Sequence, residues 1–213
     1  MLPWIAVPMA LAGWLLGWLS GALTDRLQPD QDSHAIRGRG PLVRDPLVQA
    51  ALALIWAVIP FVRGSDPLVW VATGLLTVPL VQVAVTDLRT RFVYTVVAVI
   101  GLALGLALGW QVHGVAWWWS VVGAVGGAIA FGALYGLGRL IYRGGEPLAR
   151  GDITIAAMVG AGAAACAAQA LVIGVVLSGV LALAVLAISR SRHGFMPYGP
   201  GLCLGGLVSL FLC

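Results

Sequence analysis

Long runs of apolar residues recur from one end of this 213-residue chain to the other, and short polar stretches that hold most of its charges separate them. About twenty apolar residues in a helix cross the hydrocarbon core of a bilayer, so these runs predict membrane-embedded helices. Eight are predicted: Pro3 to Leu23, Leu47 to Val62, Pro67 to Thr86, Phe92 to Trp110, Ala116 to Leu140, Ile153 to Ala165, Ala167 to Ser189, and Pro197 to Cys213.

Two of these boundaries need an argument. The apolar run from Ile153 to Ser189 exceeds one ordinary spanning helix, so we place a break near Cys166 to Gln169, where small residues are dense. The first run could be mistaken for a secretory signal, but it has no basic start and it contains Trp14 and Trp18. We therefore expect it to be retained as the first helix.

The composition indicates a single membrane domain. Hydrophobic residues make up 61% of the chain and charged residues only 9%. A soluble domain cannot bury so much apolar surface, and too little polar sequence remains for a separate soluble domain. We expect one all-α domain over residues 1–213, a polytopic bundle of about eight transmembrane helices in the lipid bilayer.

The twelve basic residues are all arginine, and they predict the orientation of the bundle. Only Arg63 follows an even-numbered helix. The other eleven follow the first, third, fifth and seventh helices: Arg26, Arg37, Arg39, Arg44, Arg89, Arg91, Arg139, Arg143, Arg150, Arg190 and Arg192. The positive-inside rule places these connections in the cytoplasm and both termini outside, in a plasma membrane. This topology and contact with anionic lipid account for the net charge of +4. The chain has no run of basic residues of the kind that a nucleic-acid-binding site requires.

Two aspartates stand at helix boundaries on the predicted cytoplasmic side. Asp87 follows the third apolar run and precedes Arg89 and Arg91, with which it could form a solvated ion pair. Asp152 precedes the sixth run, where it could act as a helix N-cap. The topology nevertheless puts both at one face. If the two carboxylates lie close together, one holds a proton while the other remains a base, and such a dyad can hydrolyse an amide bond.

The surrounding residues resemble the two signature motifs of the type IV prepilin peptidases, membrane aspartyl peptidases of the Gly-x-Gly-Asp kind. One motif is Asp87-Leu-Arg-Thr-Arg, and the other is Gly151-Asp152 before an alanine-rich helix. Thr24 to Leu27, Asp45 to Gln49 and Phe195 to Pro200 also resemble segments of that family, in the same order.

This resemblance implies eight helices and cleavage of the basic leader of pilin-like or pseudopilin precursors at the cytoplasmic membrane face. Asp87 and Asp152 would be the catalytic pair. Gly151, Arg89 and Arg91 would contact the substrate, because a glycine lets substrate backbone approach closely and the arginines flank the first aspartate.

The chain also departs from the family pattern. Phe92 to Thr95 replaces the usual Ile-Pro-Asn region, and Ala149 and Thr154 replace a Gly and a Lys of the second motif. Residues 25–46 form a shortened first cytoplasmic loop without the paired Cys-x-x-Cys motifs of many members. We therefore expect no metal, no S-adenosylmethionine and no other cofactor.

Two other functions remain open. The departures suit an inactive relative that assists the assembly of pilin-like proteins. Membrane-depth carboxylates also serve ion or proton transporters, although those are expected to carry carboxylates nearer mid-membrane and an internal repeat, and neither is apparent.

The remaining features predict packing or surface positions. Cys166, Cys203 and Cys213 lie in apolar runs and are expected to pack in the core without disulfides. Gly123, Gly127, Gly132, Gly136 and Gly138 give the spacing at which helices approach closely. Trp117 to Trp119 are expected to anchor the fifth helix, and His34, His113 and His193 to lie on the surface.

Overall fold

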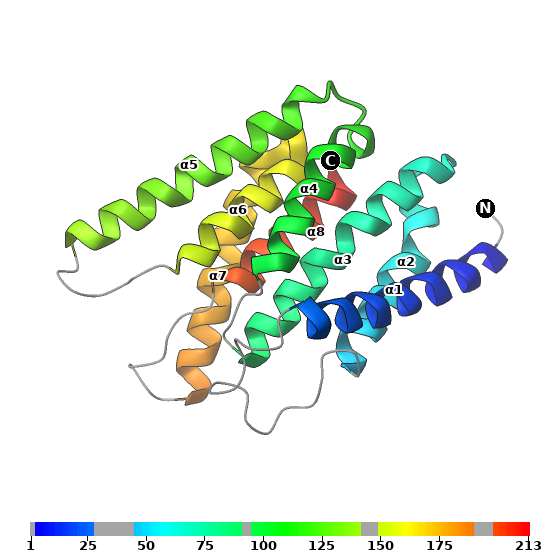
Figure 1. The fold of residues 1–213 in the computed structure, drawn as a ribbon, viewed down its shortest axis with the longest axis horizontal. Coiled ribbons are helices and arrows are strands. Elements are labelled where there is room, and N and C mark those ends of the chain that lie inside the picture. The colour runs from blue at the N-terminus through cyan, green and yellow to red at the C-terminus, as the bar shows by residue number, and fades with distance from the viewer. Residues whose placement is uncertain (1–2, 28–44, 91–94, 142–148, 190–197) are drawn as a thin grey trace.

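The computed structural model describes residues 3–27, 45–90, 95–141, 149–189 and 198–213, and within them every regular element is helical. A short 3₁₀ helix, η1 (Pro3–Ile5), leads into α1 (Ala6–Leu27). The later helices are α2 (Pro46–Val62), α3 (Pro67–Thr90), α4 (Thr95–Val112), α5 (Trp118–Ile141), α6 (Arg150–Ala163), α7 (Ala167–Ser189) and α8 (Gly199–Leu212), with the 3₁₀ turn η3 (Ala164–Cys166) between α6 and α7. The predicted all-α bundle is confirmed (Figure 1).

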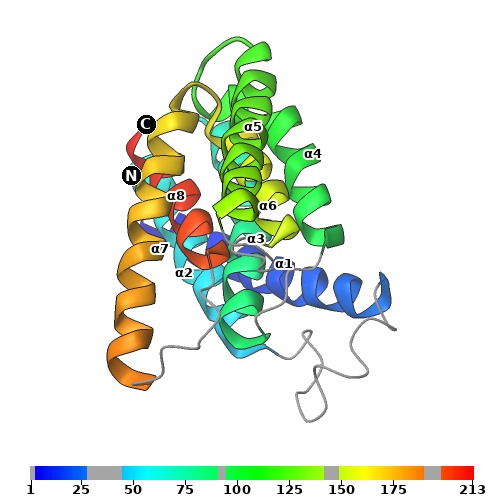
Figure 2. The ribbon, with the colours of Figure 1, turned by 90° about the vertical axis from the view of Figure 1, so that its left-hand side faces the viewer.

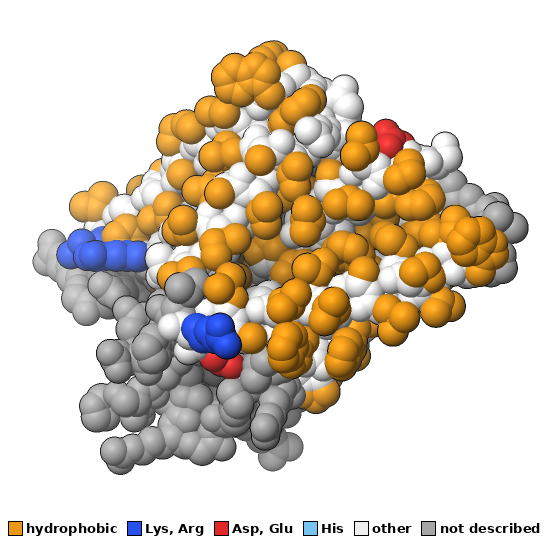
Figure 3. All heavy atoms as spheres, turned by 45° about the vertical axis from the view of Figure 1, so that its right-hand side comes forward, with side chains coloured by type: hydrophobic (Ala, Val, Ile, Leu, Met, Phe, Trp, Pro, Cys, Tyr) orange, Lys and Arg blue, Asp and Glu red, His pale blue; other side chains and the backbone are white. Residues whose placement is uncertain are grey.

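Several of these helices are long and apolar enough to cross a membrane. By length and composition α1, α3, α4 and α5 each qualify, and so does the continuous run from α6 into α7. The helices α2 and α8 are apolar but shorter, with 17 and 14 residues. Hydrophobic side chains cover most of the described surface in Figure 3, and the acidic and basic side chains in that view lie toward its edges. The fold is a helical membrane-type bundle.

Consecutive long helices run in opposite directions, so the bundle has two ends (Figures 1 and 2). We call the end at which α3 terminates and α6 and α8 begin the aspartate end. The other end, where α2 and α4 terminate and α5 begins, is the opposite end. Among the described arginines, Arg26, Arg89, Arg139 and Arg150 belong to the aspartate end and Arg63 to the opposite end.

Local sequence explains where α2 and α3 begin. Each is preceded by an aspartate and starts with a proline, Asp45-Pro46 and Asp66-Pro67. The amide of Leu47 donates a hydrogen bond of 3.0 Å to Asp45 Oδ1, and the amide two residues after Asp66 donates one of 2.9 Å to that aspartate's Oδ1. Aspartate satisfies a free amide of the first turn, and proline lacks the N–H that would be unsatisfied there. The Asp-Pro pair is therefore a start signal at both helices.

The break between α6 and α7 lies slightly before its predicted position. The helix α6 ends at Ala163, and Ala164 takes φ 47° and ψ −115°, a conformation that residues with a Cβ rarely adopt. The chain turns back through η3, and α7 then runs beside α8 (Figure 2). The prediction of two helices instead of one long helix is confirmed.

The helix α6 lies at the centre of the bundle, where α4, α5, α7 and α8 pack around it. Every residue from Ile155 to Ala163 is buried, and all but three of them are alanine or glycine. Small side chains permit close approach: a Cβ added at Gly123 of α5 would overlap the carbonyl of Gly160 of α6, and the reverse also holds. Backbone contact at this crossing therefore fixes α5 against α6.

The prediction that the glycines of α5 form a helix contact is right for one half of the helix only. Gly123 and Gly127 press against the backbone of α6. A Cβ added at Gly132 or Gly136 would have no described atom within 4 Å, so these two glycines face open space. The last turns of α5 extend away from the bundle, as Figure 1 also shows.

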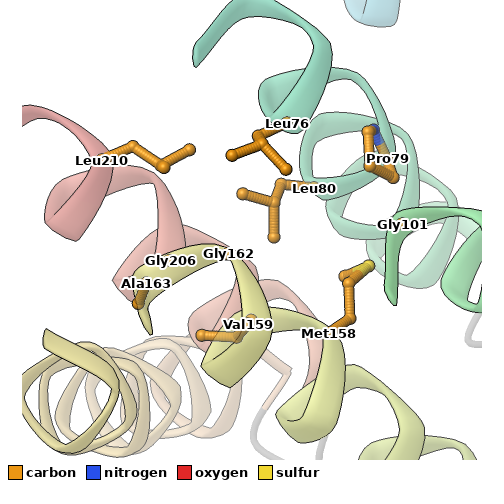
Figure 4. Close-up of a pocket in the computed structure, with 10 residues that line it drawn as sticks. All are labelled: Leu76, Pro79, Leu80, Gly101, Met158, Val159, Gly162, Ala163, Gly206 and Leu210. Atoms are coloured by element: carbon orange, nitrogen blue, oxygen red, sulfur yellow. The ribbon is translucent and has the colours of Figure 1, made fainter. Parts of the chain in front are cut away.

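Apolar residues of α3, α4, α6 and α8 enclose a cavity of about 10 Å³ (Figure 4). Its lining includes Leu80, Met158, Val159 and Leu210, and no polar side chain takes part. This volume holds at most one water molecule, and an apolar cavity of that size stays dry. The interior between these four helices is thus closely packed.

Candidate active site

Asp87 belongs to the last turn of α3. The helix continues to Thr90, beyond the predicted end at Thr86, so the aspartate lies within the helix and not after it. Its side chain is buried, with 6% of the residue exposed. Because the carboxylate is buried, the solvated ion pair that the sequence allowed does not describe its position. A buried carboxylate costs free energy unless it is paired or hydrogen-bonded.

Asp152 belongs to the first turn of α6. The helix begins at Arg150, earlier than the predicted Ile153, and Asp152 is its third residue. The expected N-cap role needs correction: the N-cap is Ala149, and its amide donates a hydrogen bond of 3.1 Å to Asp152 Oδ2. Asp152 reaches back to cap the helix start with one oxygen, and it is buried, with 5% of the residue exposed.

The helix α8 brings the two aspartates into one neighbourhood. The thiol of Cys203 on α8 is close enough to both carboxylates to interact with their charges. One turn earlier on the same helix, a Cβ at Gly199 would stand 2.5 Å from Asp87 Oδ2 and 3.2 Å from Ile155 Cδ1. Ile155 follows Asp152 by three residues, or about one helical turn. The first turns of α8 therefore lie between the end of α3 and the start of α6.

Helix N-termini surround this pair of carboxylates. Gly199 is the first residue of α8, and Asp152 lies in the first turn of α6. The N-terminal end of a helix carries a partial positive charge that stabilises a nearby anion. Each carboxylate thus has a helix N-terminus beside it, which offsets part of the cost of burying it.

Buried hydrogen bonds hold the elements that carry Asp87. The Nε2 of Gln82, one turn and a half before Asp87, donates to Thr24 Oγ1 of α1 at 2.7 Å. Thr86 Oγ1 donates to the Gln82 carbonyl at 2.7 Å. All three side chains are buried. The bond between Gln82 and Thr24 fixes the end of α3 against α1.

A second set of contacts fixes the start of α8. The hydroxyl of Ser178 on α7 lies 3.0 Å from the carbonyl of Tyr198, to which it donates, and 2.8 Å from the carbonyl of Gly174. A Cβ at Gly201 would overlap Ser178. Close contact of α7 and α8 therefore sets the position of Gly199 beside Asp87.

Sequence reasoning did not single out Gln82, Ser178, Gly199 or Cys203 as site residues. A signal was present for the first two, because a glutamine and a serine inside apolar runs must find partners when buried. Gly199 lay within a segment that resembles the peptidase family, but the sequence did not reveal that it touches Asp87. No local pattern marks Cys203.

The expected substrate-contacting residues have separate positions. Gly151 is half-buried in the first turn of α6, next to Asp152. Arg89 Nη1 forms an ion pair of 3.0 Å with Asp45 Oδ2, which links the end of α3 to the start of α2. Arg91 lies outside the described residues, as do His34, His193 and most of the loop 25–46. Their expected roles remain predictions.

The described residues contain no group of three or more His, Cys, Asp or Glu side chains that could hold a metal ion. Comparison of the chain with protein-family models, with curated proteins and with solved structures finds no match. The resemblance to prepilin peptidases therefore rests on the motifs themselves, and the geometry around Asp87 and Asp152 is the ground for a functional hypothesis.

Proposed function

We propose that this protein is an integral-membrane aspartyl endopeptidase that removes the basic leader from pilin-like precursors. Its eight helices all contribute to the membrane-embedded bundle, both termini lie outside, and the aspartate end faces the cytoplasm. The observation that carries the proposal is the burial of Asp87 and Asp152, from α3 and α6, around the first turns of α8.

The orientation follows from the charges. The described arginines at the aspartate end outnumber the single Arg63 at the opposite end, which agrees with the positive-inside rule. A leader peptide that carries basic residues would reach the site from the cytoplasm, at the level where α3 ends and α6 begins.

In the proposed mechanism the two aspartates divide the chemistry. The ionised carboxylate takes a proton from a water molecule that attacks the scissile carbonyl, and the protonated carboxylate donates a hydrogen bond to the carbonyl oxygen. In this scheme the two carboxylates share one proton, and neither role is assigned to a particular residue. The Ala149 amide engages Asp152 Oδ2, so Oδ1 is the oxygen that we assign to the reaction. Neither a metal nor a nucleophilic side chain enters these steps.

The transporter alternative is not favoured. A transporter of this kind needs carboxylates along a hydrated path. Here the two carboxylates lie at helix ends, and the space between α3, α4, α6 and α8 is an apolar cavity of about 10 Å³. These positions suit hydrolysis at one membrane face better than passage of an ion through the bundle.

Co-expression with a pilin-like precursor tests the proposal. Wild-type membranes are expected to shorten the precursor by its leader, measured by immunoblot and by mass spectrometry of the product. Asp87→Asn and Asp152→Asn are expected to abolish cleavage, because asparagine cannot supply the proton transfers. Asp66→Asn is the matched control, since it lies at the opposite end and asparagine can still cap Leu68.

Continued cleavage by either site variant would refute the peptidase. Inserted, folded wild-type protein that leaves every tested precursor intact would instead favour the inactive relative that assists assembly.

A further inference from the structure

Two basic side chains at the opposite end of the bundle have enclosed nitrogens. Arg63 caps the end of α2, and His113 follows the end of α4. Nε and Nη2 of Arg63 are buried and form no hydrogen bond within the part of the chain that the structure describes. Both ring nitrogens of His113 are also enclosed, and the Gly162 carbonyl lies beside the ring. His113 lies in the turn after α4, as predicted, and is half-buried, but its ring nitrogens are enclosed.

The two groups are neighbours. Burial, and then the charge of Arg63, lower the pKa of His113 below its ordinary value of 6.5, whereas the Gly162 carbonyl raises it. Burial also lowers the pKa of the Arg63 guanidinium. Both results mean that positive charge is crowded and poorly solvated at this place.

Among the described residues, no acidic side chain forms an ion pair with Arg63. Asp66 is the acidic residue of the connection that follows α2, and its carboxylate accepts the Leu68 amide hydrogen bond. The ion pair of Arg89 with Asp45 lies at the other end of the bundle. The cationic pair thus has donors that no described side-chain carboxylate accepts.

The thiols beside Arg63 do not supply that anion. Cys166 and Cys213 both lie close enough to Arg63 to interact with its charge. The Cys213 thiol donates a hydrogen bond of 3.3 Å to Gln169 Oε1, which requires its protonated, neutral form. Cys213 is exposed, so the prediction that all three cysteines pack in the core is wrong for this residue.

The opposite end also carries the aromatic side chains typical of the headgroup region. Trp4 and Trp117 are 63% and 65% exposed, and Trp118 stacks on Trp119 with ring centroids 4.4 Å apart. Tryptophan collects where hydrocarbon meets lipid headgroups. Arg63 and His113 therefore belong to the level at which a bilayer presents phosphate groups.

We propose that Arg63 and His113 form a binding site for a phosphate-type oxyanion at this end of the bundle. The guanidinium offers Nε and Nη2 as a planar pair of donors that suits two phosphate oxygens. His113 adds a third donor from the end of α4, so that the anion would link α2 to α4. The anion can come from a phospholipid headgroup or from free phosphate, and the chemistry is the same.

A role without any anion is the alternative that a test must exclude. The Gly162 carbonyl near His113 belongs to the last turn of α6, where a helix carries partial negative charge. Arg63 and His113 could stabilise that helix end alone. Their substitution would then lower thermal stability in the same way with and without phosphate.

Native mass spectrometry of the purified full chain in neutral detergent tests the site with three probes: phosphatidylglycerol, diacylglycerol and inorganic phosphate. Wild type is expected to retain phosphatidylglycerol and not diacylglycerol, which has the same tails but no phosphate. Arg63→Gln is expected to weaken this binding about tenfold or more, the size of effect expected for charged hydrogen bonds. His113→Gln should weaken it less.

Arg139→Gln is the matched control, because Arg139 lies at the aspartate end, with its guanidinium 5.9 Å from the Tyr135 ring centre. It should bind phosphatidylglycerol as wild type does. Arg63→Lys keeps the charge without the planar pair of donors, and weaker binding by this folded variant would support the site even if Arg63→Gln failed to fold.

A rise in thermal stability with inorganic phosphate, absent in the Arg63 variants, would identify free phosphate as a source. Retention of the phospholipid without that rise would identify the headgroup. Equal phosphatidylglycerol binding by wild type and both Arg63 variants, or equal binding of diacylglycerol, would overturn the proposal.

Discussion

Gly199 lies against the carboxylate of Asp87 so closely that a Cβ at this position would stand 2.5 Å from Oδ2. The contact joins the first residue of α8 to the last turn of α3. Real Cβ and oxygen atoms do not approach to that distance, so any side chain at 199 must displace either the carboxylate or the start of α8. Gly199 is thus a positioning residue for the proposed reaction.

Gly199→Ala is expected to lower kcat for precursor cleavage by about a hundredfold, because a shift near 1 Å in a catalytic group has effects of that order. KM should change much less, since the substitution moves a reacting carboxylate and not the substrate-binding surface. Initial-rate measurements in detergent separate the two constants.

Gly179→Ala on α7 is the control for this variant. A Cβ at Gly179 has no described neighbour within 4 Å, so wild-type cleavage is expected. If Gly199→Ala had the kcat of the control, the contact with Asp87 would have no part in catalysis.

Gly123→Ala is expected to destabilise the bundle by about 1–3 kcal/mol, the range for overpacking a well-packed core. The added methyl group would overlap the Gly160 carbonyl where α5 crosses α6. Thermal unfolding in detergent, followed by circular dichroism, measures the change.

Gly126→Ala, on the same helix, provides the comparison. Position 126 is open, and alanine favours a helix over glycine by roughly 0.5–1 kcal/mol, so this variant should be at least as stable as wild type. Equal stability of the two variants would contradict backbone contact at the α5–α6 crossing.

Asp45→Asn separates the two roles of the Asp45 side chain. Asparagine can still accept the Leu47 amide, so the α2 cap survives while the ion pair with Arg89 is lost. Because the Arg89 side chain is 44% exposed, the expected loss in unfolding free energy is only roughly 0–1 kcal/mol.

Arg89→Gln breaks the same ion pair and also removes the guanidinium. If Arg89 contacts the substrate, this variant should raise KM several-fold, whereas Asp45→Asn should leave KM nearly unchanged. Steady-state cleavage by the two variants makes the comparison. The same KM for both would mean that Arg89 serves only to join α3 to α2.

The lowered pKa of His113 predicts that the protein loses stability in acid. Its pKa is lowered in the folded protein, so the unfolded chain binds a proton more readily. Stability from this group is complete above pH about 6.5 and falls as the pH decreases toward the folded pKa. Delipidated protein without phosphate should therefore have a lower unfolding temperature at pH 5 than at pH 7.5.

In His113→Gln protein the difference between the two pH values should become smaller. A glutamine does not titrate, so whatever pH dependence remains belongs to other groups. An unchanged difference between pH 5 and pH 7.5 would show that His113 does not contribute.

Local sequence was sufficient for the helices and for several of their ends. Apolar runs longer than about fifteen residues can satisfy their backbone in a membrane only as helices, so the fold class followed from hydropathy. Asp45-Pro46 and Asp66-Pro67 marked helix starts through contacts within three residues. The break before α7 was also predictable, because the run from Ile153 to Ser189 was too long for one helix.

Helix ends without such local signals were less predictable. The sequence placed Asp87 after α3 and Asp152 before α6, yet both lie inside their helices. Polar residues such as Thr86 and Asp152 can continue a helix when neighbouring helices bury them. Hydropathy alone cannot detect that burial, since it depends on what packs against each turn.

The sequence by itself determined the all-α membrane class, the asymmetry of the arginines, and Asp87 and Asp152 as candidate residues, since each depends on composition or on neighbours along the chain. Only the tertiary structure decided that α8 lies beside both aspartates, that Gly199 touches Asp87, and that Arg63 and His113 meet at the opposite end. These contacts join residues from 50 to more than 110 positions apart, and their formation depends on which helix faces pack together, which no local pattern specifies.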